Sequence, residues 1–377
     1  MNHPSLSPTL RFLLVLCLVP LAAHAAGPKR KVILDQDAYG PGGSNMQSML
    51  MAIQSPDVEV LGITVVSGDG WEKENVAHTL RMLELIGRTD IPVVPGATMP
   101  LVNTQAETKR WETLYGKIPY KGCWMEQWPD YDNSPGRIPY HGPDVVPPLP
   151  EGEPTTQPLK ESAAEFLVRM VRKYPGEVTI LAMGPFTNVA LACALDPTFA
   201  SNAKELVAMA GSFSPHYPKK NVFALEYIYN PREEFNIRFD PEAAVMTLHA
   251  PWKKIVVIPL DATTETEMTP ELIDAAKKLS TPAARYVATY PMVGYPLWDE
   301  VAVGIWLDPN LITRSEQLSL DFDLDKGANY GATLSWMKGN GPGLGEPTVT
   351  VIWDIDVKRL GRQLVDLISL PPSPATP

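Results

Sequence analysis

The sequence predicts an α/β fold in which a mostly parallel sheet carries helices on both faces. Two observations lead to this class. From residue 31 onwards, short runs rich in Val, Ile and Leu alternate with longer stretches whose apolar residues recur every three or four positions. The strand-like runs are largely apolar, which is typical of parallel strands buried on both faces. With 45% apolar and 20% charged residues, the chain also has a globular composition.

The predicted elements follow one another in a regular order. Strands of the parallel sheet are predicted at residues 31–34, 58–66, 91–96, 178–183, 205–210 and 254–260. Helices are predicted at residues 47–54, 72–87, 163–174, 188–195 and 241–249. This alternation favours parallel pairing, because parallel strands need long crossover connections. The C-terminal part differs: residues 318–351 predict a small antiparallel portion, and residues 356–370 predict a closing helix.

The first 25 residues predict a secretory signal peptide. Arg11 precedes an apolar run at 12–23, and Ala23-His24-Ala25 supplies the small residues of a cleavage site. The run is too short to span a bilayer comfortably, so a retained membrane anchor is the less favoured alternative. We therefore expect cleavage after Ala25 and an exported protein, periplasmic or secreted, with no membrane attachment afterwards. Residues 26–377 are expected to form a single domain.

Residues 104–158 interrupt the strand–helix rhythm with an aromatic and Pro-rich insertion. Its aromatic residues include Trp111, Tyr115, Tyr120, Trp124, Trp128 and Tyr131. Long loops are usually functional lids or disordered segments, and the aromatic content argues against disorder. We expect an ordered flap over the site, without regular secondary structure. A second loop at 213–232 contains His216, which is a candidate acid or simply an exposed histidine.

Charge and cysteine content narrow the class of ligand. The formal net charge of −11 argues against a nucleic-acid partner, because phosphate backbones are bound by basic surfaces. Outside the signal peptide only Cys123 and Cys193 remain, which provide neither a disulfide framework nor a zinc pattern. The class of ligand that these observations favour is a small molecule.

Polar clusters follow the predicted strands, at the ends where open α/β sheets bind ligands. Asp35 and Asp37 come directly after the first strand and precede a Gly-rich turn that contains Ser44 and Asn45. Alternate carboxylates with nearby side-chain oxygens suit a hard cation such as Ca²⁺. Taken alone, the pattern also fits solvated loop acids. For Asp35, a direct role and a supporting role in the turn both remain open.

Three segments together resemble the inosine-uridine-preferring nucleoside hydrolase family. They are residues 178–192, residues 234–244, and Asp299 at the start of a helix that ends in Leu307-Asp-Pro. The resemblance runs from about residue 31 to the C-terminus, with the insertion as its main departure. It implies a Rossmann-like α/β domain and Ca²⁺-dependent hydrolysis of the N-glycosidic bond of ribonucleosides or a related ribosyl compound. Family members are commonly dimers or tetramers, so a homo-oligomer is also implied.

Four residues match metal-binding positions of the family. By this resemblance, Asp37 is a Ca²⁺ ligand and the general base for the attacking water, and Asp299 is a second carboxylate ligand. Met183 takes the place of a residue that ligates through its backbone carbonyl. Asn45 stands where the family has an aspartate ligand, and a neutral ligand weakens a site for a hard cation.

Five residues match substrate-binding positions. Glu234 and Asn236 correspond to residues that hold the ribose hydroxyls, and Asp69 stands where the family has a ribose-contacting asparagine. Ser44 replaces an aspartate that binds the ribose 2′-hydroxyl. Trp298 replaces a histidine that is a candidate leaving-group acid; tryptophan has no proton to give, although it can stack on a base.

These departures leave two functions open. The first is an exported Ca²⁺-dependent nucleoside hydrolase, which the retained carboxylates Asp37 and Asp299 favour. The second is a catalytically inactive or ligand-binding relative that has lost the metal, which the neutral pair Ser44-Asn45 favours.

Overall fold

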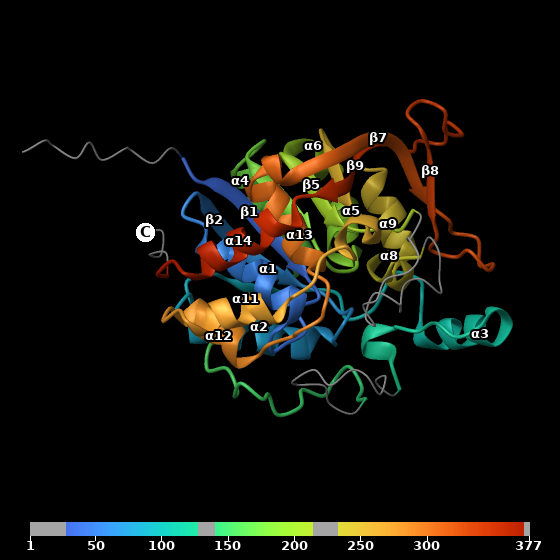
Figure 1. Ribbon diagram of the computed structural model, residues 1–377. Helices are drawn as coiled ribbons and strands as arrows, with labels where there is room; N and C mark the ends of the chain where they lie inside the picture. The colour runs from blue at the N-terminus through green and yellow to red at the C-terminus, as the bar shows by residue number, and fades with distance from the viewer. Residues whose placement is uncertain (1–27, 127–139, 214–232, 373–377) are drawn as a thin grey trace, which may run out of the picture.

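The computed structural model describes residues 28–126, 140–213 and 233–372 (Figure 1). The predicted signal peptide, part of the insertion with Trp128 and Tyr131, and most of the second loop with His216 lie outside the described residues. None of the helices in the described ranges is long and apolar enough to cross a membrane.

A nine-stranded sheet forms the centre of the described structure. Its strands are β1 (Arg30–Gln36), β2 (Val58–Val65), β3 (Val93–Pro95), β4 (Val178–Ala182), β5 (Glu205–Met209), β6 (Ile255–Ile258), β7 (Ile312–Phe322), β8 (Thr333–Met337) and β9 (Thr348–Ile355). They lie in the order β3-β2-β1-β4-β5-β6-β9-β7-β8. In this spatial order, every neighbouring pair from β3 through β1 and β4 to β9 is parallel. Strand β7 runs antiparallel to both β9 and β8. The predicted fold class, including its small antiparallel C-terminal portion, is confirmed.

Helices cover both faces of this sheet (Figure 1). One face carries α1 (Gly43–Gln54), α2 (Glu72–Ile86), α10 (Leu260–Thr263), α11 (Pro270–Lys277), α12 (Pro282–Thr289), α13 (Trp298–Leu307) and α14 (Val357–Ile368). The other carries α4 (Ala163–Lys173), α5 (Thr187–Leu195), α6 (Phe199–Asn202) and α9 (Pro241–Leu248). Each face therefore has its own apolar core, as the uniformly apolar strands predict.

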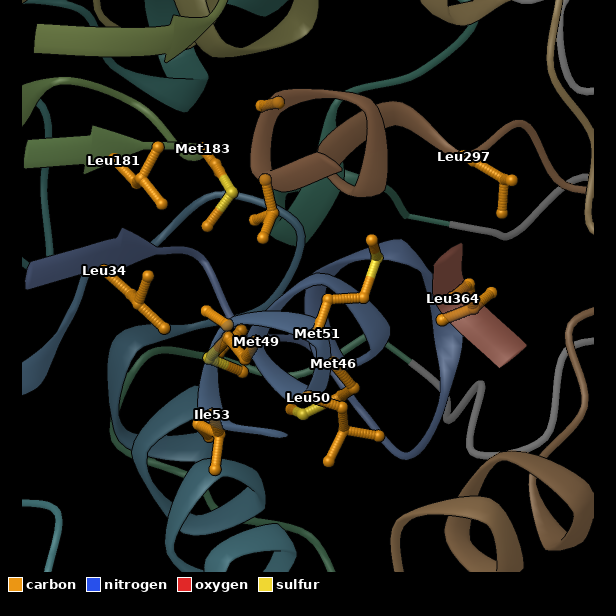
Figure 2. Close-up of a cluster of buried hydrophobic side chains, with 14 of the residues drawn as sticks. Leu34, Met46, Met49, Leu50, Met51, Ile53, Leu181, Met183, Leu297 and Leu364 are labelled. Atoms are coloured by element: carbon orange, nitrogen blue, oxygen red, sulfur yellow. The ribbon is translucent and has the colours of Figure 1, made fainter. Parts of the chain in front are cut away.

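Helix α1 is buried along its whole length. Figure 2 shows its methionines and leucine, among them Met46 and Met49, beside Leu34 of β1 and Leu364 of α14. Burial of side chains of this size stabilises a fold by about 1.5–3 kcal/mol each. The helix that carries two predicted site residues is thus anchored in the core.

Helix α1 begins earlier than the predicted helix at 47–54. Gly42 and Gly43 have φ values of 80° and 77°, a region that glycine adopts without steric cost. The Gly-rich turn therefore leads directly into the helix. As a result, Ser44 and Asn45 lie in the first turn of α1 rather than in a loop.

The expectation that the insertion contains no regular element is wrong. Residues Gln105–Tyr115 form helix α3, and Gly122–Trp124 form a short 3₁₀ turn. Thr104 caps α3, because its side chain accepts a hydrogen bond from the Glu107 N–H at 3.1 Å. The indole of Trp111 is buried and donates to the carbonyl of Gly327 at 2.8 Å, which holds α3 against the β7–β8 connection.

The second half of the insertion is fastened to helix α2. His141 Nε2 lies 3.2 Å from Glu74 Oε2, and the buried imidazole of His78 hydrogen-bonds the carboxylate of Glu151. Further along, Glu84 accepts a hydrogen bond from a backbone N–H of the insertion, that of Thr156, at 2.7 Å. The insertion is therefore held at α3 and again along α2.

Candidate active site

The predicted site residues gather at the carboxyl ends of the central strands. Asp37 directly follows β1, Met183 directly follows β4, and Asp69 lies in the turn after β2. β1 and β4 are neighbours, and the chain leaves them towards opposite edges of the sheet. Open α/β sheets bind their ligands at such a switch point. The fold therefore brings residues that are distant in sequence to the expected location.

Asp37 is buried and is held by hydrogen bonds to both carboxylate oxygens. Its Oδ1 accepts from Asn45 Nδ2 at 2.9 Å, and its Oδ2 accepts from the backbone N–H of Asp69 at 2.8 Å. Two glycines lie directly against it. A Cβ on Gly68 would be 2.2 Å from Asp37 Oδ2, and a Cβ on Gly184 would be 2.7 Å from the Asp37 backbone nitrogen. The turns after β2 and β4 thus close around one carboxylate.

Gln36 connects this carboxylate to helix α13. Its Oε1 accepts from the backbone N–H of Asp37 at 3.0 Å and from Asn45 Nδ2 at 3.2 Å. Its Nε2 donates to Asp299 Oδ2 at 2.9 Å. Through this buried amide, Asp37, Asn45 and Asp299 belong to one hydrogen-bonded group.

Burial and mutual repulsion raise the pKa values of the two acids. The pKa of Asp37 lies well above its usual value, first because the carboxyl group is buried and then because Asp69 and Asp299 are close. Burial also raises the pKa of Asp299 well above its usual value, and the neighbouring Glu300 adds to the effect. The charged forms of these carboxylates are therefore costly in the absence of a positive partner.

The donor set fits a hard cation. In the described ranges, neither Asp37 nor Asp299 forms an ion pair with Lys or Arg, so a cation would relieve the repulsion between them. The amide oxygen of Asn45 and the backbone carbonyl of Met183 are ligands that Ca²⁺ accepts. Among the described residues, no three His, Cys, Asp or Glu side chains converge on one point. A cation at this position would thus depend on the amide and carbonyl oxygens as well as the two carboxylates.

The Ser44 hydroxyl is engaged by protein groups. It donates to Glu300 Oε2 at 2.5 Å and accepts from the backbone N–H of Asp299 at 2.8 Å. Glu300 is fully buried, and burial raises its pKa to about 8. Ser44 therefore fastens the start of α1 to the start of α13, beside a predicted metal ligand. Its contact with a ribose stays a prediction.

Glu234 and Asn236 reach the same edge of the sheet from the short helix α8 (Phe235–Phe239). Glu234 caps this helix, because its carboxylate accepts from the N–H groups of Asn236 at 2.8 Å and Ile237 at 3.2 Å. Burial nevertheless raises the pKa of Glu234 to about 7. The Asn236 amide donates to the carbonyl of Met183 at 3.3 Å, which links α8 to the end of β4.

Asp69 is contacted by the insertion. Its Oδ1 accepts a hydrogen bond from the hydroxyl of Tyr120 at 2.7 Å. The Tyr120 ring meets Phe235 edge-on, with 5.0 Å between ring centroids. A second aromatic of the insertion, Trp124, is buried and stacks on Phe239 at 4.3 Å, so it serves to fill the interior.

Two further predicted residues lie at the margin of the group. Trp298 is the first residue of α13, is half-buried, and meets Tyr295 edge-on at 6.1 Å. Asp35 is buried, with hydrogen bonds from Thr64 Oγ1 at 3.0 Å and Asn188 Nδ2 at 3.4 Å. These bonds tie β1 to β2 and α5. They favour the supporting role for Asp35.

Three residues of the group were not anticipated from the sequence: Gln36, Glu300 and Tyr120. Gln36 and Glu300 each stand next to a predicted ligand in an otherwise apolar element, and a polar residue in such a run is a usable signal. Tyr120 is one of several aromatic residues of the expected flap, but its contact with Asp69 could not be predicted, because that contact depends on how a long connection returns to the sheet.

Comparisons with known proteins agree with this architecture. The family model described as "Inosine-uridine preferring nucleoside hydrolase" matches residues 32–362. The chain is 30% identical to Uridine nucleosidase 1 of Arabidopsis thaliana over 352 residues, which cover 88% of this chain and 91% of that protein. It is 26% identical to the pyrimidine-specific ribonucleoside hydrolase RihB of Escherichia coli over 320 residues, or 81% of this chain and 87% of RihB.

A solved structure shows the same fold. The plant nucleoside hydrolase PpNRh1 superposes with a TM-score of 0.69 at 23% identity, over 91% of this chain and all of that one (100%). The family model spans nearly the whole described structure and includes all of the residues gathered around Asp37. This chain is therefore a member of the inosine-uridine preferring nucleoside hydrolase family, a family of N-ribosyl glycosidases.

Proposed function

We propose that the protein is an exported enzyme that hydrolyses the N-glycosidic bond of ribonucleosides with a bound Ca²⁺. Family membership supports the class of reaction. The observation that carries the proposal is Asp37, buried at the switch point of the sheet and joined through Gln36 to a second buried carboxylate, Asp299. Buried acids with shifted pKa values that cluster at a ligand-binding edge are typical of functional sites. The acidic chain also favours a nucleoside over a nucleic acid.

Asp37 is the residue that takes the proton of the attacking water. A general base needs a fixed orientation and an ionised form at the working pH. The hydrogen bonds from Asn45 and from the Asp69 N–H supply the orientation. Ca²⁺, held by Asp37, Asn45, Asp299 and the Met183 carbonyl, would lower the pKa of nearby water and of the carboxylates and hold sugar hydroxyls.

Glu234, Asn236 and Asp69 hold the ribose in this proposal. Departure of the nucleobase leaves positive charge on the sugar ring. Carboxylates placed around the ring therefore stabilise the transition state more than the ground state. Glu234 is kept in one orientation by the backbone N–H groups of α8. In the same proposal the aromatic side chain of Trp298 stacks on the nucleobase.

A ribose-release assay on the full chain tests the proposal. With uridine and inosine as substrates, we expect Ca²⁺-supplemented protein to release reducing sugar and chelator-treated protein to release little. The D37N variant should lose at least about 1,000-fold in kcat, because it lacks the base and a charged ligand. D57N is the matched control, because Asp57 is exposed at the opposite end of β2. Normal activity of D37N would refute the role of Asp37.

The same assay separates the enzyme from an inactive relative. Ser44 and Asn45 are neutral where the family has acids, and Ser44 is engaged with Glu300. A protein that binds uridine or inosine in calorimetry but releases no ribose, with or without Ca²⁺, would be a ligand-binding relative instead.

Export rests on residues 1–25, which lie outside the described structure. We expect the protein recovered outside the cytoplasm to begin at Ala26, as N-terminal sequencing would show. A mature protein that still begins at Met1 would contradict export by signal cleavage.

A further inference from the structure

The insertion touches the candidate site through backbone contacts at one turn. The N–H of Cys123 donates to the carbonyl of Gly68 at 2.8 Å. Gly122 lies so close that a Cβ there would be 2.1 Å from the same carbonyl oxygen. Gly68 is also the residue against which Asp37 Oδ2 lies. The insertion and the turn after β2 therefore pack directly against each other at this point, next to Asp37.

Tyr120 precedes this turn and directs its hydroxyl to Asp69. The Tyr120 hydroxyl donates to Asp69 Oδ1 at 2.7 Å, while the Asp69 N–H donates to Asp37 Oδ2 at 2.8 Å. The ring of Tyr120 rests edge-on against Phe235, the residue after Glu234. One side chain of the insertion thus contacts Asp69 and the residue next to Glu234.

An ionised aspartate has only hydrogen-bond acceptors, and its carboxylate rotates freely unless donors hold it. Asp69 also lies close enough to Asp37 to repel it. The Tyr120 hydroxyl is a donor on the side of the insertion, and it holds Oδ1 of the Asp69 carboxylate. A hydrogen bond to a charged acceptor is strong enough to hold one such orientation.

We propose that Tyr120 is a positioning residue for substrate binding: its hydroxyl orients the Asp69 carboxylate towards a ribose hydroxyl. The insertion is then a fixed wall of the active site. This inference rests on the proposed nucleoside hydrolase function. It goes further, because it assigns a part in sugar recognition to the insertion, the main departure of this chain from the family resemblance.

A double-mutant cycle tests the inference in the full chain. The variants are Y120F, D69A and the double variant, and the readouts are kcat and KM for uridine and inosine with Ca²⁺ present. We expect Y120F to lower kcat/KM about tenfold, mainly through KM, because it removes one hydrogen bond to a charged group. In the D69A background the same change should cost less than about twofold, because the acceptor is already gone. Y140F is the matched control, since the Tyr140 hydroxyl binds Gln105 within the insertion, away from Asp69.

The possible outcomes distinguish failure of this inference from failure of the proposed function. An equal cost of Y120F in both backgrounds would show that Tyr120 only supports the insertion, which overturns the inference and leaves the proposed function intact. If the wild-type chain binds these nucleosides in calorimetry without turnover, the cycle is measured on Kd. Coupling there supports the inference although hydrolysis has failed, and additivity there overturns it. Absence of both binding and turnover overturns the inference and the proposed function together. Melting temperatures within about 2 °C of wild type verify that the variants fold.

Discussion

Asp37 owes its position to residues that lack a side chain. Gly68 and Gly184 allow two turns to approach the carboxyl group and backbone of Asp37 more closely than any Cβ would permit. The cost of filling such a contact is a shift of the backbone or of the carboxylate itself. The position of the Asp37 carboxylate therefore depends on close packing against these two glycines as much as on its hydrogen bonds.

We expect G68A to damage both activity and stability. The added methyl group would collide with Asp37 Oδ2, which lies 2.2 Å from the Cβ position, so the free energy of unfolding should fall by about 1–3 kcal/mol. Displacement of the Asp37 carboxylate should reduce kcat by about 100-fold. G142A is the control, because a Cβ on Gly142 meets nothing within 4 Å. Denaturant melts and ribose release on both variants would check this, and equal behaviour of the two would contradict it.

Asp240, at the start of α9, is expected to make stability depend on pH. It is buried, and burial raises its pKa to about 6 although Thr187 and the Leu101 and Ala243 N–H groups donate to it. In the unfolded chain the group ionises near its ordinary value of 3.8. Its contribution to stability is therefore complete below about pH 4 and is lost as the pH rises to about 6.

The D240N variant should lack this part of the pH dependence. Between about pH 4 and 6, the free energy of unfolding of the wild type should fall by about 2 kcal/mol more than that of the variant. Urea unfolding at both pH values measures the difference, and contributions of other acids cancel between the two proteins. Parallel pH profiles would show that Asp240 titrates normally.

At the scale of elements, helices with weak patterns were harder to predict than strands. The strands of the central sheet were anticipated because their β-branched runs are buried on both faces, so composition alone marks them. The helices at 270–277 and 282–289 were not anticipated, because eight residues carry too little periodicity. Their start signal, Thr-Pro at 269–270 and again at 281–282, is nevertheless present: in both, the threonine caps and the proline follows it.

Helix α3, within the insertion, is another helix that its local sequence pattern did not predict. Its apolar residues are few, and its burial depends on a partner distant in sequence, the β7–β8 connection. Trp111 is buried against that connection, and the guanidinium of Arg238 lies 5.0 Å from its ring centroid. The buried face of α3 is therefore determined by its neighbours in the fold, and not by a periodic pattern of apolar residues in its own sequence.

W111A should detach α3 from the rest of the molecule. The variant loses a buried indole, the hydrogen bond to the Gly327 carbonyl and the contact with Arg238. We expect a loss of about 3–5 kcal/mol in the free energy of unfolding. W111F keeps an aromatic ring over Arg238 and should lose less than half as much. Denaturant titration compares the two; a loss below about 1 kcal/mol in W111A would contradict a structural role.

At the scale of the whole molecule, the topology determined the site more reliably than any single motif. The mostly parallel sheet and the positions of Asp37, Asp69, Met183 and Asp299 could be predicted, because each of these residues follows a recognisable strand or opens a recognisable helix. The links among them could not. Gln36 joins β1 to α13 only because the folded sheet brings those elements together. Such contacts depend on three-dimensional proximity that local sequence does not contain.

Ca²⁺ should stabilise the folded protein if the buried acids share a cation. At a free Ca²⁺ concentration 100 times the dissociation constant, binding adds about 2.7 kcal/mol to the free energy of unfolding. Scanning calorimetry with Ca²⁺ and with chelator should therefore show a higher melting temperature in Ca²⁺. The D299N variant should lose most of this increment. Identical melting temperatures of the wild type in the two conditions would argue against a cation at Asp37 and Asp299.

The two-ended attachment of the insertion has a consequence for limited proteolysis. The turn at Gly122–Trp124 rests on the Gly68 carbonyl, and the segment from His141 to Thr156 is bonded to α2. A single cut between these two anchors would leave both pieces in place. The nicked chain would migrate as one particle in size exclusion, would separate into two fragments only in denaturant, and would keep Tyr120 beside Asp69.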